Sequence, residues 1–275
     1  MVSFLSAIAT WGPSVYCALG IANTLVTPSI VKSKYGPTRL AKDLLPEVFE
    51  KEPKLRQDIA LYRVTDIPYA SAIGTNFGPA AVVFVNQELA SDQKTLKYIC
   101  KHELSHINTS DGLVAPALAA TVSAISTYAV PYLHSCLPWW IAPIAYCVPA
   151  FVAANTYNAA MAIFEDRADR FAARHATTEE LLAIERFIKG QIEVNKVMRA
   201  KYPQFFSADG NTRLALGDIN HSSLTDRLEE VRAECRNRKI PIEESSVEQL
   251  EKMNNVKKFH ENTYSKFFRL VNATI

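Results

Sequence analysis

The feature that most constrains the fold is a run of 53 residues, 112–164, that contains no Asp, Glu, Lys or Arg. A helix needs about 20 apolar residues to cross a bilayer, so this run has room for two spans and a turn. We predict spans near 113–133 and 141–161, joined at 134–140, where Pro138 and two tryptophans suit a membrane interface. The alternative is a pair of helices buried in a soluble core, because four prolines interrupt the predicted helices.

Residues 1–31 form a second segment without charges. No basic region precedes its apolar part, so it is more typical of a membrane anchor than of a removable signal peptide. Gly12-Pro13 splits the segment, which leaves three possibilities open: a kinked single span, a re-entrant segment and an interfacial helix.

Basic residues follow both apolar segments and predict the topology of the chain. They are Lys32, Lys34, Arg39, Lys42, Arg167, Arg170 and Arg174. By the positive-inside rule, both flanks belong on the cytoplasmic side. A hairpin returns the chain to the side that it left, so residues 32–111 and 165–275 can form one body there. We therefore predict an integral membrane protein with an N-terminal membrane segment, 1–31, and one domain, 32–275, that the hairpin at 112–164 interrupts.

The composition argues against two classes of protein. The chain has 30 basic and 28 acidic residues, which is a net charge of +2. Nucleic-acid binding driven by bulk charge does not fit this balance, so we expect no nucleic-acid partner. The five cysteines include no CxxC pair, which predicts free thiols in a reducing compartment rather than a disulfide framework or a Cys-ligated zinc site.

Residues 102–106 read HELSH, an HExxH motif. They lie on a predicted helix that begins after Ser91-Asp92 and ends before Gly112. His102 and His106 are four residues apart, so both can present ring nitrogens to one metal ion from the same helix face. Glu103 would stand beside the metal-bound water and take its proton. The alternative is that the two histidines only decorate the end of a helix.

A catalytic zinc usually has three protein ligands, so a third ligand is required. The second apolar span continues into Glu165 and Asp169, which are four residues apart on one predicted helix face. Glu165 can complete the metal site, and Asp169 can accept a hydrogen bond from the far ring nitrogen of a ligand histidine. The alternative is that both are surface acids paired with nearby arginines.

These residues, in this order, resemble the membrane gluzincin peptidases, which include the bacterial heat-shock protease HtpX, the CAAX prenyl protease and the mitochondrial inner-membrane stress protease. The pattern E-x-x-A-D, which carries the third ligand of that family, matches Glu165, Ala168 and Asp169. Residues 71–88 resemble the family's turn and strand ahead of the metal helix, with serine at 71 in place of the usual asparagine. Residues 221–227 resemble its C-terminal H-P-(x)4-R element, with serine in place of the proline.

The resemblance covers roughly residues 65–230 and implies a zinc-dependent endopeptidase that acts on membrane or misfolded proteins. It implies one Zn²⁺ per chain, held by His102, His106 and Glu165. It also implies that His221 and Arg227 lie near the site, where either can donate a hydrogen bond to a developing oxyanion. A lone histidine, however, is more often a helix cap or a satisfied surface residue.

The predicted fold class is mainly α with a small β-sheet, an α+β zincin-like fold, plus a transmembrane helical hairpin. Residues 80–85, AAVVFV, form either an edge strand with which an extended substrate pairs or an ordinary buried strand. Two functions remain. One is an endopeptidase whose partners are a protein or peptide substrate and the lipid bilayer. The other is a non-catalytic membrane protein with a structural or vestigial zinc site that acts through partner binding. A structural site needs no general base, so Glu103 favours the first.

Overall fold

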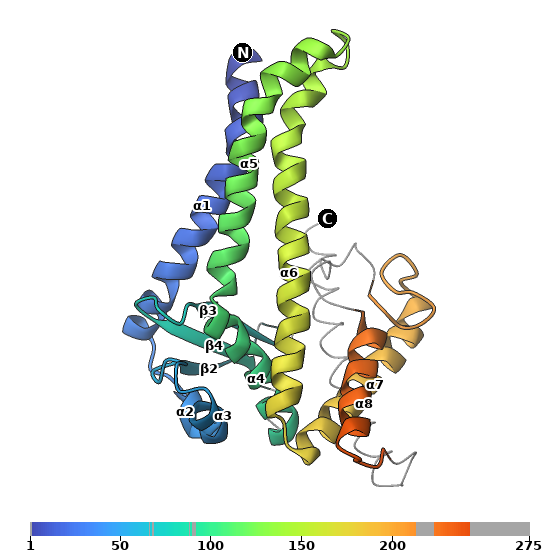
Figure 1. Ribbon diagram of the computed structural model, residues 1–275. Helices are drawn as coiled ribbons and strands as arrows, with labels where there is room; N and C mark the ends of the chain where they lie inside the picture. Colours follow the sequence, from blue (N-terminus) through green and yellow to red (C-terminus); the bar gives the residue numbers. More distant parts are fainter. Residues whose placement is uncertain are drawn as a thin grey trace.

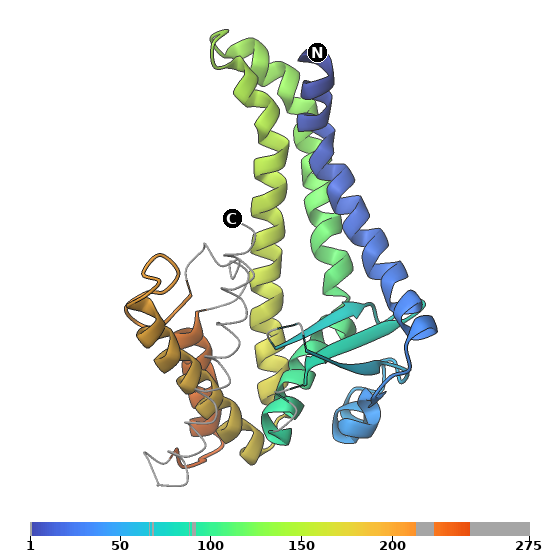
Figure 2. The same ribbon diagram turned by 180° about the vertical axis from the view of Figure 1, so that it is seen from behind.

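The computed structural model describes residues 2–65, 67, 69–87, 89, 92–212 and 223–242 (Figure 1). Three long helices lie side by side: α1 (Val2–Lys34), α5 (Asp111–Cys136) and α6 (Val148–His175). A body of shorter helices and a sheet gathers at one end of this stalk (Figures 1 and 2). The N-terminus and the turn between α5 and α6 lie together at the other end. The protein is mainly helical with a small sheet, as predicted.

The stalk helices expose most of their apolar side chains. Each helix is long and apolar enough to cross a membrane, and at most 33% of each helix's apolar window is buried. This exposure argues against helices enclosed in a soluble core, which was the alternative for 112–164. The large exposed side chains of the stalk include Tyr16, Leu19, Ile125, Tyr128, Phe151 and Ile163. Hydrocarbon, unlike water, would solvate such a surface at no cost.

The prolines affect the two apolar segments differently. Helix α1 is continuous through Pro13 and Pro28, so neither proline ends the helix. In the second segment the regular helix begins later than predicted. Residues Ala142–Cys147 form a 3₁₀ turn, η2, and α6 starts only at Val148 with Pro149 in its first turn. Proline is tolerated in a first turn, where the backbone N–H has no helical acceptor.

Helix α1 holds the start of α5 through the Gly112 carbonyl, which has no helical hydrogen-bond donor because residue 116 is proline. The Gly112 carbonyl would normally accept a hydrogen bond from the backbone four residues on, but Pro116 has no N–H there. The Thr24 hydroxyl of α1 lies 2.9 Å from this carbonyl oxygen and donates to it. Gly112 also lets the helices approach closely, because a Cβ there would stand 3.2 Å from the Thr24 methyl group. Neighbouring helices commonly satisfy such freed backbone groups in membrane proteins.

The sheet has four strands in the order β1-β2-β4-β3. They are β1 (Arg39–Leu40), β2 (Ala60–Val64), β3 (Ala70–Gly74) and β4 (Ala81–Asn86). Strand β4 is parallel to β2 and antiparallel to β3, so the run at 80–85 is an interior strand, and β1 and β3 are the edges. Val82, Val83 and Val85 are almost fully buried because both faces of the sheet are covered.

The covering elements pack on opposite faces of the sheet. Two short helices, α2 (Ala41–Leu44) and α3 (Pro46–Lys51), share a core with α4 (Gln93–Thr109) on one face. This core joins Val83 and Val85 to Leu104 and Ile107 of α4. On the opposite face, Val82 packs with Val31 near the end of α1. The sheet therefore holds α4, which carries HELSH, in a fixed relation to the stalk.

Capping residues set the ends of the body helices. Asp92 accepts hydrogen bonds from the first turn of α4, as predicted, and Ser223 caps α8 (Leu224–Asn237). Helix α7 (Thr178–Arg199) begins with a capping box between Thr177 and Glu180. Helix α4 ends at Ser110, whose φ of 58° is left-handed, and α5 starts at the next residue. The sequence also predicts a helix at 246–268, with Ser246 as its cap, and these residues lie outside the described part of the chain.

Candidate metal centre

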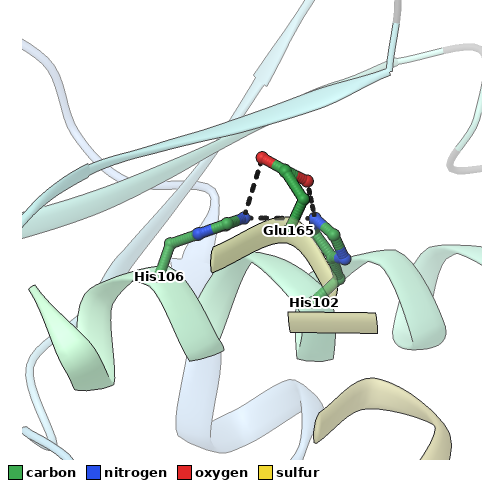
Figure 3. A group of neighbouring side chains, drawn as sticks. All are labelled: His102, His106 and Glu165. Atoms are coloured by element: carbon green, nitrogen blue, oxygen red, sulfur yellow. Dashed lines mark hydrogen bonds and ion pairs between the residues drawn. The ribbon is translucent and has the colours of Figure 1, made fainter. Parts of the chain in front are cut away.

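Helices α4 and α6 bring His102, His106 and Glu165 together in a buried cluster (Figure 3). The two Nε2 atoms are 3.2 Å apart. Glu165 offers one carboxylate oxygen at 3.1 Å from His102 Nε2 and the other at 3.4 Å from His106 Nε2. The hairpin thus returns Glu165 to the motif helix, so the surface-acid alternative does not hold for this residue.

The three side chains fit a zinc ion. In a tetrahedral site with bonds of roughly 2.0–2.1 Å, ligand atoms lie about 3.3 Å from one another. The spacings of 3.1–3.4 Å between the donor atoms agree with that value. Two imidazoles and one carboxylate are also a usual ligand set for a catalytic zinc. The residues could therefore hold one divalent metal ion and leave a fourth position open.

Asp169 lies at the far ring nitrogen of His102, in the place predicted for it. Its Oδ1 atom is 2.9 Å from His102 Nδ1. Arg227 donates from Nη2 to the same Asp169 oxygen at 2.7 Å, so it lies close to the centre but is engaged by a carboxylate. His221 lies outside the described residues.

A second carboxylate, which sequence reasoning missed, holds the other histidine. Asp111 Oδ2 is 2.8 Å from His106 Nδ1, and Asp111 is only 2% exposed. In the sequence Asp111 is simply the charge that precedes the apolar run. Its position five residues after His106, at a helix end, was the available signal, but only the sharp turn at Ser110 brings the two side chains together.

Glu103 is buried beside the cluster and faces a small cavity. The cavity has a volume of about 130 Å³ and is lined by His102, Glu103 and Arg227 together with mainly apolar and aromatic side chains. The latter include Tyr98, Ile99, Ile184, Phe187, Ile188 and Leu224. Among the described residues, none hydrogen-bonds the Glu103 carboxylate. A carboxylate in this position is available to a molecule in the cavity.

Comparison with known proteins adds no relative: no family model, no curated protein and no solved structure matches the chain. The resemblance to membrane gluzincins therefore rests on the buried group of His102, His106 and Glu165 and on the three apolar helices.

The carboxylates alter the acidity of both histidines. Burial on its own would lower the pKa of His102, but Asp169 and Glu165 outweigh it and raise the pKa to about 9. Burial likewise opposes protonation of His106, and Asp111 and Glu165 raise its pKa to about 10. Without a metal ion, the pair therefore holds a proton at neutral pH. A metal ion must displace that proton, because only the neutral imidazole is a ligand.

We expect the affinity for zinc to rise with pH. Each proton displaced makes the affinity increase about tenfold per pH unit, and this dependence holds at pH values below the raised pKa values of the histidines. Calorimetric titration of zinc into the metal-free protein, in two buffers of different ionisation enthalpy, measures the number of protons released. Release of at least one proton per zinc at pH 7.5 is expected. A pH-independent affinity with no proton release would contradict this assignment.

Proposed function

We propose that the protein is a membrane-embedded, zinc-dependent endopeptidase. The observation that carries this proposal is the buried cluster of His102, His106 and Glu165 with Glu103 directly beside it, facing a cavity. A structural metal site is closed and has no use for an adjacent carboxylate base. Here the base and the ligand residue His102 line the same cavity. The HELSH motif therefore has the surroundings that metal-assisted hydrolysis requires.

Each residue has a role in the proposed reaction. When bound, zinc supplies an acidified water and polarises the scissile carbonyl. Glu103 takes the proton of the attacking water and later passes it to the leaving amine. Asp169 holds His102 so that its Nε2 lone pair faces the metal position. Arg227 keeps Asp169 ionised, and in the same cavity its guanidinium is a source of positive charge near a developing oxyanion.

The cavity and the sheet suggest how a polypeptide binds. Ala70, the first residue of the edge strand β3, lines the same cavity as Glu103. An extended peptide beside β3 would be held by its backbone and would place one side chain in the apolar cavity. This arrangement assigns the substrate-pairing edge to β3 rather than to residues 80–85. Protein or peptide chains are thus the proposed substrates, and nucleic acids are not.

We propose that the stalk crosses the bilayer and that the body lies on its cytoplasmic side. The apolar helices support the first statement, and the basic residues after α1 and in α6 support the second. In this arrangement residues 1–31 anchor the chain, and residues 32–275 form one catalytic domain around the hairpin at 112–164. The substrates would then be membrane proteins or misfolded proteins near the membrane surface.

The test is zinc content and proteolysis of the full chain in lipid nanodiscs. We expect about one zinc per chain, with cleavage of fluorescently labelled casein that stops on chelation and returns with zinc. Glu165→Ala should lose most of its zinc and its activity, whereas Glu193→Ala, on an exposed part of α7, should retain both. Zinc without hydrolysis would favour the non-catalytic membrane protein. No zinc in the wild type would make HELSH a coincidence of spacing.

A further inference from the structure

Three helices meet where His106 contacts Asp111. His106 lies in the last turn of α4, and Asp111 is the first residue of α5. Arg167, two residues beyond Glu165 on α6, reaches across to this junction. One of its guanidinium nitrogens, Nη2, forms an ion pair with Asp111 Oδ1 and lies 2.7 Å from the Thr109 hydroxyl. The Asp111 carboxylate is therefore bound on one oxygen by His106 and on the other by Arg167.

The arrangement repeats the one around the other histidine. On that side the order is His102, Asp169 and Arg227, and on this side it is His106, Asp111 and Arg167. Both aspartates are at least nine-tenths buried. Burying a carboxylate without a counter-charge costs free energy, because an apolar environment disfavours the charge. The arginine in each chain of contacts offsets that cost.

Arg167 is itself held in one place. Its guanidinium lies over the Phe164 ring, 4.7 Å from the ring centroid, and Phe164 is buried in a cluster with Ala115 of α5. The contacts of Arg167 therefore depend on how α6 is placed relative to α4 and α5. Because Glu165 is on the same helix, the contacts of Arg167 and the third metal ligand move together.

We propose that Asp111 and Arg167 are positioning residues for His106, and that through them the packing of the hairpin helices sets the geometry of the metal centre. This inference rests on the proposed metal centre. Asp111 accepts the Nδ1 hydrogen of His106, so the lone pair of Nε2 faces the metal position and the ring cannot rotate away. Arg167 holds the Asp111 carboxylate in this orientation through its other oxygen. Loss of such a partner typically weakens metal binding by about 10–100-fold.

The test uses Co²⁺ as the probe, because its visible spectrum reports the coordination geometry directly. The full chain in nanodiscs is titrated with Co²⁺ and then with Zn²⁺ against a competing chelator. Asp111→Ala should bind both ions about 10–100-fold more weakly and should shift the Co²⁺ absorption bands. Asp111→Asn retains an acceptor oxygen of the same size, and Arg167→Lys retains the charge. The metal affinity of both variants should lie between that of the wild type and the weaker affinities of Asp111→Ala and Arg167→Met.

Arg170→Met is the matched control. Arg170 lies about one turn after Arg167 on α6 and forms an ion pair with Asp166. Its side chain is 61% exposed. The Arg170→Met variant should therefore have the same Co²⁺ spectrum and the same metal affinity as the wild type. If Asp111→Ala and Arg167→Met also bind Co²⁺ with the wild-type spectrum and affinity, and differ only in thermal stability, the residues are merely structural and the inference is wrong. A wild type that binds no metal would overturn the metal centre itself, and the two failures are therefore distinguishable.

Discussion

Glu103→Gln is expected to bind zinc as the wild type does and to hydrolyse peptides about 10²–10⁴-fold more slowly. The amide has nearly the same shape as the carboxylate, so the cavity and the neighbouring ligands are retained. It cannot accept a proton from the attacking water, and this is the step that the proposal assigns to Glu103. Binding and turnover should thus separate in one variant. The measurements are zinc content and the rate of casein cleavage, both in nanodiscs.

The control for this prediction is Glu193→Gln, which makes the same chemical change at an exposed position 42% accessible to solvent. It should leave both zinc content and cleavage rate unchanged. Normal turnover by Glu103→Gln would show that another group acts as the base. Loss of zinc in Glu103→Gln would show instead that the residue supports the metal, and the assigned mechanism would not stand.

Lys101→Met should destabilise the body by about 3–5 kcal/mol, because it leaves a buried carboxylate without its counter-charge. Lys101 precedes the motif and is 0% exposed. Its ammonium contacts Glu180 at 2.6 Å, Glu47 at 3.1 Å and the carbonyl oxygen of His175 at 2.9 Å. Glu180, only 3% exposed, also accepts the Thr177 backbone N–H and so closes the capping box of α7. Chemical denaturation of the metal-free protein in detergent measures the effect.

Lys196→Met is the matched control, because it makes the same substitution in an ion pair that is exposed to solvent. Its ion pair with Glu193 is 2.9 Å long, but both side chains are more than 40% exposed, so the expected cost is below about 1 kcal/mol. In the double variant Lys101→Met/Glu180→Gln, the buried charge is gone, and we expect part of the lost stability to return. Equal costs for Lys101→Met and Lys196→Met would show that the buried pair contributes nothing specific.

Much of the arrangement could be predicted because it depends on neighbours in the chain. The hydrocarbon-like surface of the stalk follows from two segments without charges, and no folding step can place charges where there are none. The shared face of His102 and His106 follows from the helical repeat, and so does that of Glu165 and Asp169. The caps Asp92 and Ser223 act within their own first turns.

The features that the sequence left open or did not indicate concern contacts between distant segments. The run at 80–85 has the same composition whether one neighbour pairs with it or two, so only the sheet order β1-β2-β4-β3 decided that it is an interior strand. The apolar pattern of 112–164 did not show where proline would delay the start of α6. From the sequence Lys101 looks like an ordinary surface lysine on α4. Nothing nearby in the chain indicates that it pairs with Glu180, 79 residues later.

The sequence by itself therefore determined the membrane-like segments, the motif helix and the two faces that carry possible ligands, because each depends on spacing within a helix turn or on local composition. Only the tertiary structure decided that α6 returns Glu165 to within 3.1–3.4 Å of both histidines, and that Asp111 and Arg167 meet at the second of them. These contacts join separate helices. Their geometry is set by how the helices pack, which no local pattern specifies.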